Sequence, residues 1–379
     1  MSKHIIIISN SSSNVLNFRS ELIKKLINES FKVSVIVPSI DFSSEFEKKF
    51  FKLGVKTYQI FLDRAGLNPI NDIRTYILLK NFFKKIKPDI VLSYTAKPII
   101  YSGLAIGRND KIKFFPNITG LGYGFTEKSG FKRSLVNFVL KFLYKLSLKF
   151  STSIIFQNPD DEILFRNLGI IKKKKIFIVN GSGVDINFFT PTSLPSKPIF
   201  LMLARLVTDK GVMEYCEAAK EIRKKFPNAI FQLAGKLDPN PSGFKYGKLK
   251  EYIDKNDIEY FGHIDDVRLL LNNCRYFVLP SYREGTPRSV LEAMSVGRPI
   301  ITTNTAGCRE TVEDGINGLL VPIKDSKSLA LAMKKMIEYN DNKINEMANE
   351  SIKLVRKKYD VRKVNENIIQ IINYKYQND

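Results

Sequence analysis

Hydrophobic positions in the first half of the chain alternate between two spacings. Short runs rich in β-branched residues predict strands at residues 5–9, 32–38, 55–61 and 89–94. Between the first two runs, Phe18, Leu22, Leu26 and Ile27 recur at helical spacing, and a second helix is predicted over residues 73–85. Strands that alternate with helices indicate a parallel, doubly wound sheet.

The same alternation restarts in the second half. Residues 189–198 contain three prolines among small polar residues, which predicts a linker between two domains. Beyond it the pattern predicts strands at 199–204, 230–234, 276–280 and 299–303, and helices at 212–225 and 288–295. We therefore expect an α/β fold of two Rossmann-like domains, 1–188 and 199–355, that face a central cleft. Ligands of such sheets bind at the carboxyl ends of the strands.

The C-terminal segment, 356–379, contains an amphipathic helix at 361–374. No segment has the length needed to span a bilayer. The apolar run after Met1 is too short for a signal peptide and is read as a buried strand.

The formal net charge of +22 over 379 residues is the strong compositional feature. It favours an anionic partner, which leaves nucleic acid, an acidic membrane surface and phosphorylated substrates open. The three cysteines lack CxxC spacing, which argues against a structural zinc site and fits a reducing cytoplasm. No GxGxxG follows a strand and no GxxxxGK[ST] occurs, so a dehydrogenase and a P-loop ATPase are disfavoured.

Two glutamates, Glu284 and Glu292, lie eight positions apart around a Gly285-Thr286-Pro287 turn. Pro287 suits the first turn of a helix and Thr286 its cap, which places Glu284 before the helix and Glu292 inside it. Two acceptors at this spacing can hold hydroxyls at the two ends of a nucleotide-sugar, with the helix N-terminus open to its diphosphate. Ordinary solvated acids on a surface helix remain the alternative on spacing alone.

Two cations follow the first predicted strand of the second half. Arg205 closes this strand and Lys210 opens the next helix, so both lie at a strand's carboxyl end. The planar guanidinium and the compact ammonium together can neutralise a diphosphate without a metal. In a chain this basic, two solvated side chains are the alternative reading.

Taken as a set, these features resemble the GT-B glycosyltransferases of family 4. The resemblance rests on short segments in order: Arg205-Leu206, Lys210-Gly211, Phe261-Gly262-His263, Leu279-Pro280-Ser281, Glu284 to Glu292, Gly297-Arg298-Pro299 and Asn317-Gly318. It implies that Arg205 and Lys210 bind the donor pyrophosphate, that Glu284 contacts the donor sugar and that Glu292 contacts the ribose. The loop of Gly262, His263 and Ile264 is then expected near the base. The resemblance also implies that the C-terminal segment, 356–379, crosses back to the first domain.

Further segments resemble a bacterial subgroup that adds a sugar to a polyprenyl-diphosphate-linked glycan during surface polysaccharide or glycoprotein glycan assembly. They are 17–19, 117–122, 156–159, 181–185, 240–241 and 307–310. The resemblance implies a retaining transfer from a UDP-sugar, with an N-acetylhexosamine expected, at the cytoplasmic face of the inner membrane. No cofactor is expected. The adjacent acids Asp160-Asp161 and Asp265-Asp266 suit helix starts better than metal binding, so we predict no metal requirement.

Many relatives carry a histidine in the first domain, but this chain has only His4 and His263. The general base is therefore not assigned, which fits a mechanism in which the departing phosphate takes the acceptor's proton. Lys97 stands near the expected place. It is a candidate for contact with phosphate, and the alternative is that Lys97 is a loop residue without a role. The other candidates on the acceptor side are Arg19, Thr119, Gly120 and Gly122.

The segment 131–150 combines large apolar residues with a basic stripe and contains no acid. This pattern is typical of a helix that lies on an anionic membrane surface, although a core helix with solvated lysines fits it as well. The candidates for membrane contact are Arg133, Phe138, Lys141, Phe142, Lys145 and Lys149.

Two other functions remain open at this stage. A GT-B sugar-nucleotide epimerase would isomerise a nucleotide-sugar without an acceptor, and the paired glutamates disfavour it. A nucleic-acid-binding protein is suggested by charge alone, but it would need aromatic side chains for base stacking among the cations. Here the aromatic residues mostly follow core periodicity, so we expect no nucleic-acid partner.

Overall fold

The computed structural model describes residues 2–63, 66, 68–121, 131–171, 173–238 and 243–374. The chain divides into two compact units. Unit 1 consists of Met1–Ser182 together with Val364–Asp379, and unit 2 consists of Gly183–Lys363. Residues 183–188, which the sequence analysis assigns to the first domain, therefore belong to unit 2.

Unit 1 is built on a seven-stranded parallel sheet with the order β3-β2-β1-β4-β5-β6-β7. Its strands are β1 (His4–Ile8), β2 (Lys32–Pro38), β3 (Lys56–Ile60), β4 (Ile90–Tyr94), β5 (Lys113–Ile118), β6 (Ile154–Phe156) and β7 (Ile176–Ile178). The four strands predicted in this half are confirmed, with ends that shift by a residue at most. β1 contributes Ile5 and Ile7 to one face and Ile6 and Ile8 to the other, as a strand buried on both faces requires.

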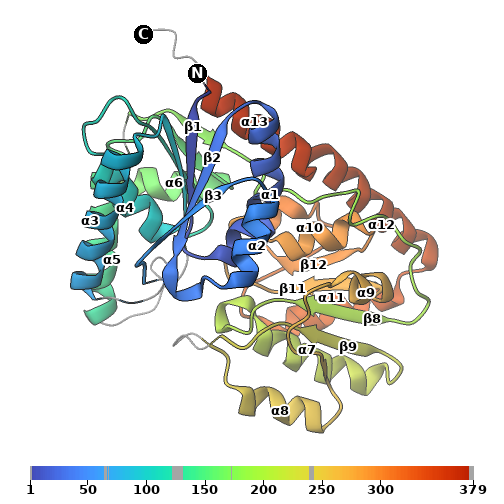
Figure 1. Cartoon of the computed structure of the whole chain (residues 1–379). Coiled ribbons are helices and arrows are strands. Elements are labelled where there is room, and N and C mark those ends of the chain that lie inside the picture. The colour runs from blue at the N-terminus through green and yellow to red at the C-terminus, as the bar shows by residue number, and fades with distance from the viewer. Residues whose placement is uncertain are drawn as a thin grey trace. The chain divides into compact units, whose positions relative to one another are not determined.

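Helices cover both faces of this sheet (Figure 1). One face carries α1 (Ser12–Asn28), α2 (Ser44–Lys52) and α13 (Val361–Asn373). The other carries α3 (Pro69–Ile86), α4 (Ala96–Ile106), α5 (Phe131–Leu148) and α6 (Pro159–Asn167). The last helix joins the core of unit 1 because Val364, Ile368 and Ile372 are buried with the residues of α1 and β1.

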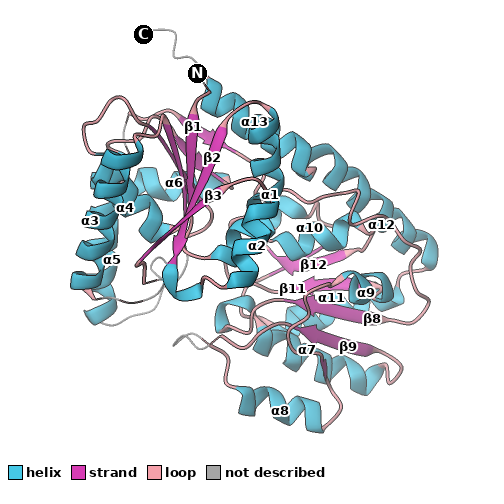
Figure 2. Ribbon diagram, viewed as in Figure 1, coloured by secondary structure: helices cyan, strands magenta, loops and turns pink. Residues whose placement is uncertain are grey.

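Unit 2 has a six-stranded parallel sheet with the order β10-β9-β8-β11-β12-β13. Its strands are β8 (Ile199–Leu203), β9 (Ile230–Ala234), β10 (Glu259–Tyr260), β11 (Tyr276–Leu279), β12 (Ile300–Thr303) and β13 (Gly318–Val321). Its helices are α7 (Val212–Lys225), α8 (Tyr246–Asp254), α9 (Arg268–Asn273), α10 (Arg288–Ser295), α11 (Ser326–Glu338) and α12 (Asp341–Leu354). Strands β9, β8, β11 and β12 lie side by side in Figure 2. The predicted strands and helices of this half are confirmed. None of the helices in the described part of the chain is long and apolar enough to cross a membrane.

The first residues of unit 2 pair with its last residues. Val184 donates to the Tyr359 carbonyl at 2.9 Å, and its own carbonyl accepts from the Val361 N–H at 3.0 Å. Gly183 has φ +68°, and a Cβ there would lie 2.6 Å from the Val361 Cα. Glycine is therefore required both by the backbone conformation and by the close approach of the second segment.

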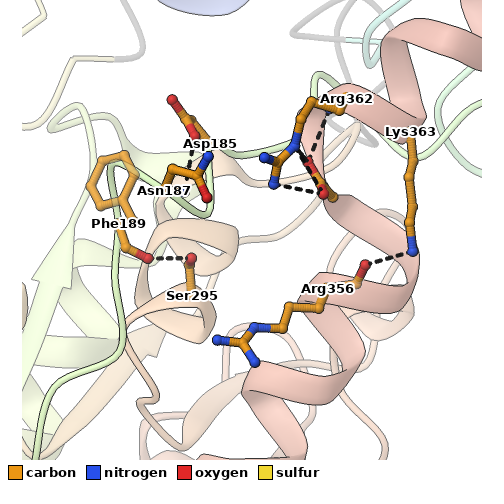
Figure 3. Close-up of polar contacts among 8 residues, drawn as sticks. Asp185, Asn187, Phe189, Ser295, Arg356, Arg362 and Lys363 are labelled. Atoms are coloured by element: carbon orange, nitrogen blue, oxygen red, sulfur yellow. Dashed lines mark hydrogen bonds and ion pairs between the residues drawn. The ribbon is translucent and has the colours of Figure 1, made fainter.

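Residues 189–198, predicted as a linker between the domains, lie within unit 2 and are held there by buried polar groups. The Arg298 guanidinium is fully buried and donates to the carbonyls of Thr192, at 3.1 Å, and Leu271, at 2.9 Å. The Ser295 hydroxyl donates to the Phe189 carbonyl at 2.6 Å, as Figure 3 shows. Five donors on a planar group make arginine suited to tying several backbone carbonyls together.

Candidate functional site

The cations and acids singled out in the second half all follow strands of one sheet. Arg205 comes after β8, Glu284 after β11 and Gly262 after β10. These strands are parallel, and β8 and β11 are neighbours. Their carboxyl ends therefore meet at one edge of the unit 2 sheet, which is where ligands of doubly wound sheets bind.

Lys210 and Glu284 form an ion pair at this edge. The Lys210 ammonium donates to the Glu284 carboxylate although the two residues are 74 positions apart. Both side chains are mostly shielded, with 21% and 12% of their surfaces exposed. Lys210 ends the 3₁₀ turn Thr208–Lys210, so this turn and the loop after β11 meet at the two charges.

Two glycines allow the backbone to pack closely around this pair. At Gly307, with φ +80°, a Cβ would lie 2.3 Å from the Glu284 carbonyl oxygen. At Gly211, with φ +73°, a Cβ would lie 2.1 Å from the Pro280 carbonyl oxygen. The Glu284 N–H also donates to the Ala306 carbonyl at 3.0 Å. The backbone carrying Glu284 is thus held from both sides.

Arg205 is the more exposed of the two cations. Its guanidinium donates to the Asp238 carboxylate at 2.6 Å, and 54% of the Arg205 side chain is exposed. Asp238 lies in the loop after β9, which passes so close to β8 that a Cβ on Gly235 would lie 1.7 Å from the Ala204 carbonyl oxygen. Each predicted diphosphate-binding cation therefore has a carboxylate partner.

Glu292 lies inside α10, as predicted, and accepts from the Arg288 Nε at 2.9 Å. Burial raises the pKa of the Glu292 carboxyl, and the neighbouring Arg288 opposes this rise. The predicted helix range, 288–295, is confirmed, but the predicted cap is wrong by one position. Pro287 occupies the cap position instead of the first turn, and the Thr286 hydroxyl donates to the Gly285 carbonyl at 3.0 Å.

The predicted base-side loop lies at the end of β10. The Gly262 carbonyl accepts from the Gly235 N–H at 2.7 Å, which ties this loop to the one after β9. Ile264 packs against the core of unit 2, whereas His263 is exposed and contacts Asp265 at 3.3 Å. The loop after β9 thus lies between the loop of Gly262, after β10, and the loop of Arg205, after β8.

The two pairs of adjacent acids, Asp160-Asp161 and Asp265-Asp266, lie in different surroundings. Asp160 and Asp161 lie in the first turn of α6, as predicted, after the Asn158 cap. Asp266 accepts from the Arg268 N–H and side chain, and Arg268 holds its pKa down at about 2. Within the described ranges, no three His, Cys, Asp or Glu side chains gather as a metal site. The absence of a metal requirement stays a prediction.

Tyr282 is a residue of this edge that the sequence analysis did not single out. Its hydroxyl donates to Glu214, in the first turn of α7, and its N–H donates to the Asp209 carbonyl at 2.8 Å. Its place directly after β11, two residues before Glu284, was the available signal. The pairing with Glu214 has no signature in the sequence because the two residues are 68 positions apart.

The candidates on the acceptor side belong to unit 1. Arg19 is buried, with its guanidinium 4.0 Å above the Tyr94 ring. Lys97 is paired with Asp72 at 2.7 Å and also donates to the Gly66 carbonyl at 2.6 Å. Thr119 and Gly120 follow β5 and are half-buried, whereas Gly122 lies outside the described residues. Lys97 therefore lies in α4 and is paired with Asp72, so it is not a free loop lysine.

Helix α5 is confirmed over the predicted basic segment, and its outer side is apolar. The side chains of 131–133, among them Arg133, lie outside the described part. The exposed large side chains are Leu135, Phe138, Val139, Phe142 and Leu146, with Lys145 and Lys149 also exposed and Lys141 half-buried. The opposite side packs tightly, since a Cβ on Gly103 of α4 would lie 2.1 Å from the Ser147 hydroxyl oxygen. The apolar outer side is thus not the one used for the core.

An open pocket of about 300 Å³ lies elsewhere on unit 2, beside the linker. Its lining includes Phe189, Arg268 and Val296, which precede strands β8, β11 and β12. It therefore opens toward the amino-end edge of the sheet and includes none of the predicted donor residues.

Two family models match the chain. The model described as "Glycosyl transferases group 1" matches residues 185–355, and "Glycosyl transferase 4-like" matches residues 4–158. The first covers the predicted donor residues and the second covers most of unit 1. Solved structures support the same fold. A Rickettsia africae glycosyltransferase aligns over all of both chains with TM-score 0.77 at 20% identity. Anabaena HepE in complex with UDP-glucose aligns over 97% of this chain and 99% of its own, with TM-score 0.78 at 17% identity.

Two curated relatives match over most of their length. The N,N'-diacetylbacillosaminyl-diphospho-undecaprenol alpha-1,3-N-acetylgalactosaminyltransferase of Campylobacter jejuni is 33% identical over 89% of this chain and 90% of its own. The UDP-Gal:alpha-D-GlcNAc-diphosphoundecaprenol alpha-1,3-galactosyltransferase of Escherichia coli is 28% identical over 83% and 82%. With the fold and the paired glutamates, this similarity identifies the chain as a member of the group 1, family 4 glycosyltransferases with the GT-B fold.

Proposed function

We propose that this glycosyltransferase moves a sugar, with an N-acetylhexosamine expected, from a UDP-sugar to a polyprenyl-diphosphate-linked glycan. The observation that carries the proposal is the meeting of Lys210 and Glu284 at the carboxyl edge of the unit 2 sheet, with Arg205 on a neighbouring loop. Two cations beside a sugar-binding acid match a charged diphosphate joined to a polyhydroxylated ring.

The relatives support the substrate classes. Both names describe transfer to an undecaprenol-diphosphate-linked sugar, one of them from UDP-galactose. HepE was solved with UDP-glucose, although its likeness to this chain is one of fold. The choice of N-acetylhexosamine rests on the relative from Campylobacter jejuni, whose name describes an N-acetylgalactosaminyl transfer.

In the proposed reaction the bond between the anomeric carbon and the β-phosphate oxygen breaks, and the acceptor oxygen bonds to the same face of the sugar. Negative charge grows on the β-phosphate as this bond breaks. Lys210 and Arg205 stabilise that charge, which is the electrostatic part of catalysis. Glu284 orients the sugar and offsets positive charge on its ring, and Glu292 holds the ribose. The acceptor's proton passes to the departing phosphate.

Lys210 and Arg205 must exchange partners for this reaction. Lys210 is paired with Glu284 and Arg205 with Asp238. The diphosphate then replaces Asp238 on Arg205 and competes with Glu284 for Lys210. Glu284, once released, turns to the sugar hydroxyls. Because two cations already neutralise the diphosphate charge, we propose that the transfer needs no metal.

A lipid-linked acceptor would also account for the exposed apolar residues on the outer side of α5. We propose that the exposed apolar residues of α5, with Lys141, Lys145 and Lys149, rest on the anionic cytoplasmic face of the inner membrane. Apolar side chains bury in the interfacial region, and each lysine near an anionic surface adds about 1 kcal/mol. The enzyme is then peripheral and meets its lipid-linked acceptor at the surface where that acceptor is anchored.

The testing experiment incubates the purified chain with a panel of UDP-sugars and a short polyprenyl-diphosphate monosaccharide, with and without EDTA. UDP release and the mass of the lipid product are both measured. A gain of one sugar from a single donor, unchanged by EDTA, is the expected result. UDP release without a lipid gain would overturn the acceptor, and activity lost with EDTA would overturn metal independence. An isomerised UDP-sugar would favour the epimerase instead.

A further inference from the structure

Tyr282 links three segments at the carboxyl edge of the unit 2 sheet. Its N–H donates to the Asp209 carbonyl at 2.8 Å, next to Lys210. Its carbonyl accepts from the Thr305 hydroxyl at 3.0 Å, and its hydroxyl donates to the Glu214 carboxylate. The side chain thus spans from the loop that carries Glu284 to the first turn of α7.

Glu214 has no part in the proposed chemistry, yet its carboxylate is shielded. The Oε2 atom is buried and has no hydrogen-bond partner, so the bond from Tyr282 reaches only Oε1. A buried carboxylate oxygen without a partner costs free energy, which makes the remaining bond important for where this side chain lies. Burial, with the Glu214 charge next to it, raises the pKa of the Tyr282 hydroxyl, so this hydroxyl stays a proton donor.

The two charged groups of the donor site lie on the two segments that this contact joins. Glu284 is two residues after Tyr282, and Lys210 is four residues before Glu214 at the start of α7. The ring of Tyr282 is also covered by the Lys324 ammonium, 5.2 Å from its centroid. A displacement of the ring would therefore move the loop of Glu284 relative to the turn of Lys210.

We propose that Tyr282, acting through Glu214, is a positioning residue that sets the spacing between Lys210 and Glu284 for the donor. The proposal rests on the proposed function. It assigns no new chemistry, because Tyr282 only positions Lys210 and Glu284, whose roles are assigned there. Tyr282 itself touches no reacting atom. Its effect is on the diphosphate affinity of Lys210 and on the alignment of Glu284 with the sugar.

The experiment compares Tyr282→Phe with Tyr215→Phe as a matched control. Tyr215 lies on α7 and is buried, and its hydroxyl donates to the Phe200 and Gln232 carbonyls of the core. Both variants lose one tyrosine hydroxyl from the same helix neighbourhood, so both lose stability. The dissociation constant for UDP, the KM for the donor, kcat and the thermal midpoint are measured for each.

For Tyr282→Phe, we expect the dissociation constant for UDP and the donor KM to rise about tenfold, as the loss of a bond to a charged group predicts. Tyr215→Phe should change both less than about twofold despite its lower thermal midpoint. Glu214→Gln keeps an oxygen that accepts from Tyr282 and should retain near-native affinity, whereas Glu214→Ala should match Tyr282→Phe. The double variant Tyr282→Phe/Glu214→Ala should be no weaker than either single one.

Two results distinguish a failure of the positioning role of Tyr282 from a failure of the proposed function. If the unaltered enzyme binds UDP and Tyr282→Phe keeps an affinity within about twofold of Tyr215→Phe, the positioning role is overturned and the proposed function stands. If the unaltered enzyme binds no UDP, both are overturned together. Additive losses in the double variant would show that Tyr282 does not act through Glu214.

Discussion

Lys210 donates a hydrogen bond to the Glu284 carboxylate, which joins the ends of two neighbouring strands by opposite charges. Each group is assigned to a different part of the donor, the ammonium to the diphosphate and the carboxylate to the sugar. The ion pair therefore keeps both groups shielded and near the places where we propose that they act. Its first consequence concerns the removal of one partner.

Lys210→Ala should weaken UDP binding by roughly 1.5–3 kcal/mol, the value of a hydrogen bond to a charged group, which is about ten- to hundredfold. Transfer should fall at least as much, because the same charge is needed as the phosphate departs. Calorimetry with UDP measures the first effect. Lys225→Ala, at the far end of α7 in an exposed pair with Glu221, is the control. Equal affinity in both variants would remove Lys210 from the site.

Asp238→Asn should tighten UDP binding, because the diphosphate would no longer compete with Asp238 for Arg205. The pair is partly exposed, and such pairs contribute about 0–1 kcal/mol, so the expected gain is at most about fivefold. The gain should shrink as salt is added. Weaker binding in this variant would mean that Asp238 orients Arg205 instead of competing with the donor.

Replacing Phe138 and Phe142 by serine should reduce binding to anionic lipid vesicles by more than tenfold. A buried phenylalanine is worth about 1.5–3 kcal/mol, and both side chains are exposed on α5. Phe51→Ser is the matched control, because Phe51 is 84% exposed but lies on α2, which covers the other face of the unit 1 sheet. Sedimentation with vesicles measures both, and equal losses would place the membrane surface elsewhere.

Gly183→Ala should destabilise unit 2 more than Gly315→Ala. Both glycines have positive φ, which costs an alanine about 1–2 kcal/mol, but a Cβ at Gly315 meets nothing within 4 Å. At Gly183 it would lie 2.6 Å from the Val361 Cα, so the pairing of Val184 with Asp360 must open as well. Urea unfolding of the two variants gives the comparison. Equal midpoints would contradict the close packing of these segments.

Eight strands of the two sheets, and the place of the candidate donor residues just after them, could be predicted because both depend on local patterns. The donor roles of these residues stay a prediction. Strands buried on both faces are apolar without interruption, and Arg205, Lys210 and Glu284 each stand a few residues after such a run. The cap of α10 was predicted one position too early, since proline is compatible with both the cap and the first turn.

Partners distant in the sequence were beyond reach. Arg19 was a candidate on the acceptor side, and it is buried over Tyr94, because the buried side of α1 is set by Val15, Leu22 and Leu26 and passes through position 19. An aromatic face can stabilise such a cation, but no spacing in the sequence announces it. Lys97 likewise finds Asp72 on another helix, 25 residues away.

The return of α13 to unit 1 affects the order in which a newly made chain can fold. Val364, Ile368 and Ile372 belong to the core of unit 1, but they are synthesised after the whole of unit 2. Unit 2 is continuous in sequence, so its core can close while the chain is still attached to the ribosome. Unit 1 must wait with an apolar face uncovered until the last helix emerges. Truncation just before residue 364 should therefore yield a chain whose second unit folds and whose first unit aggregates.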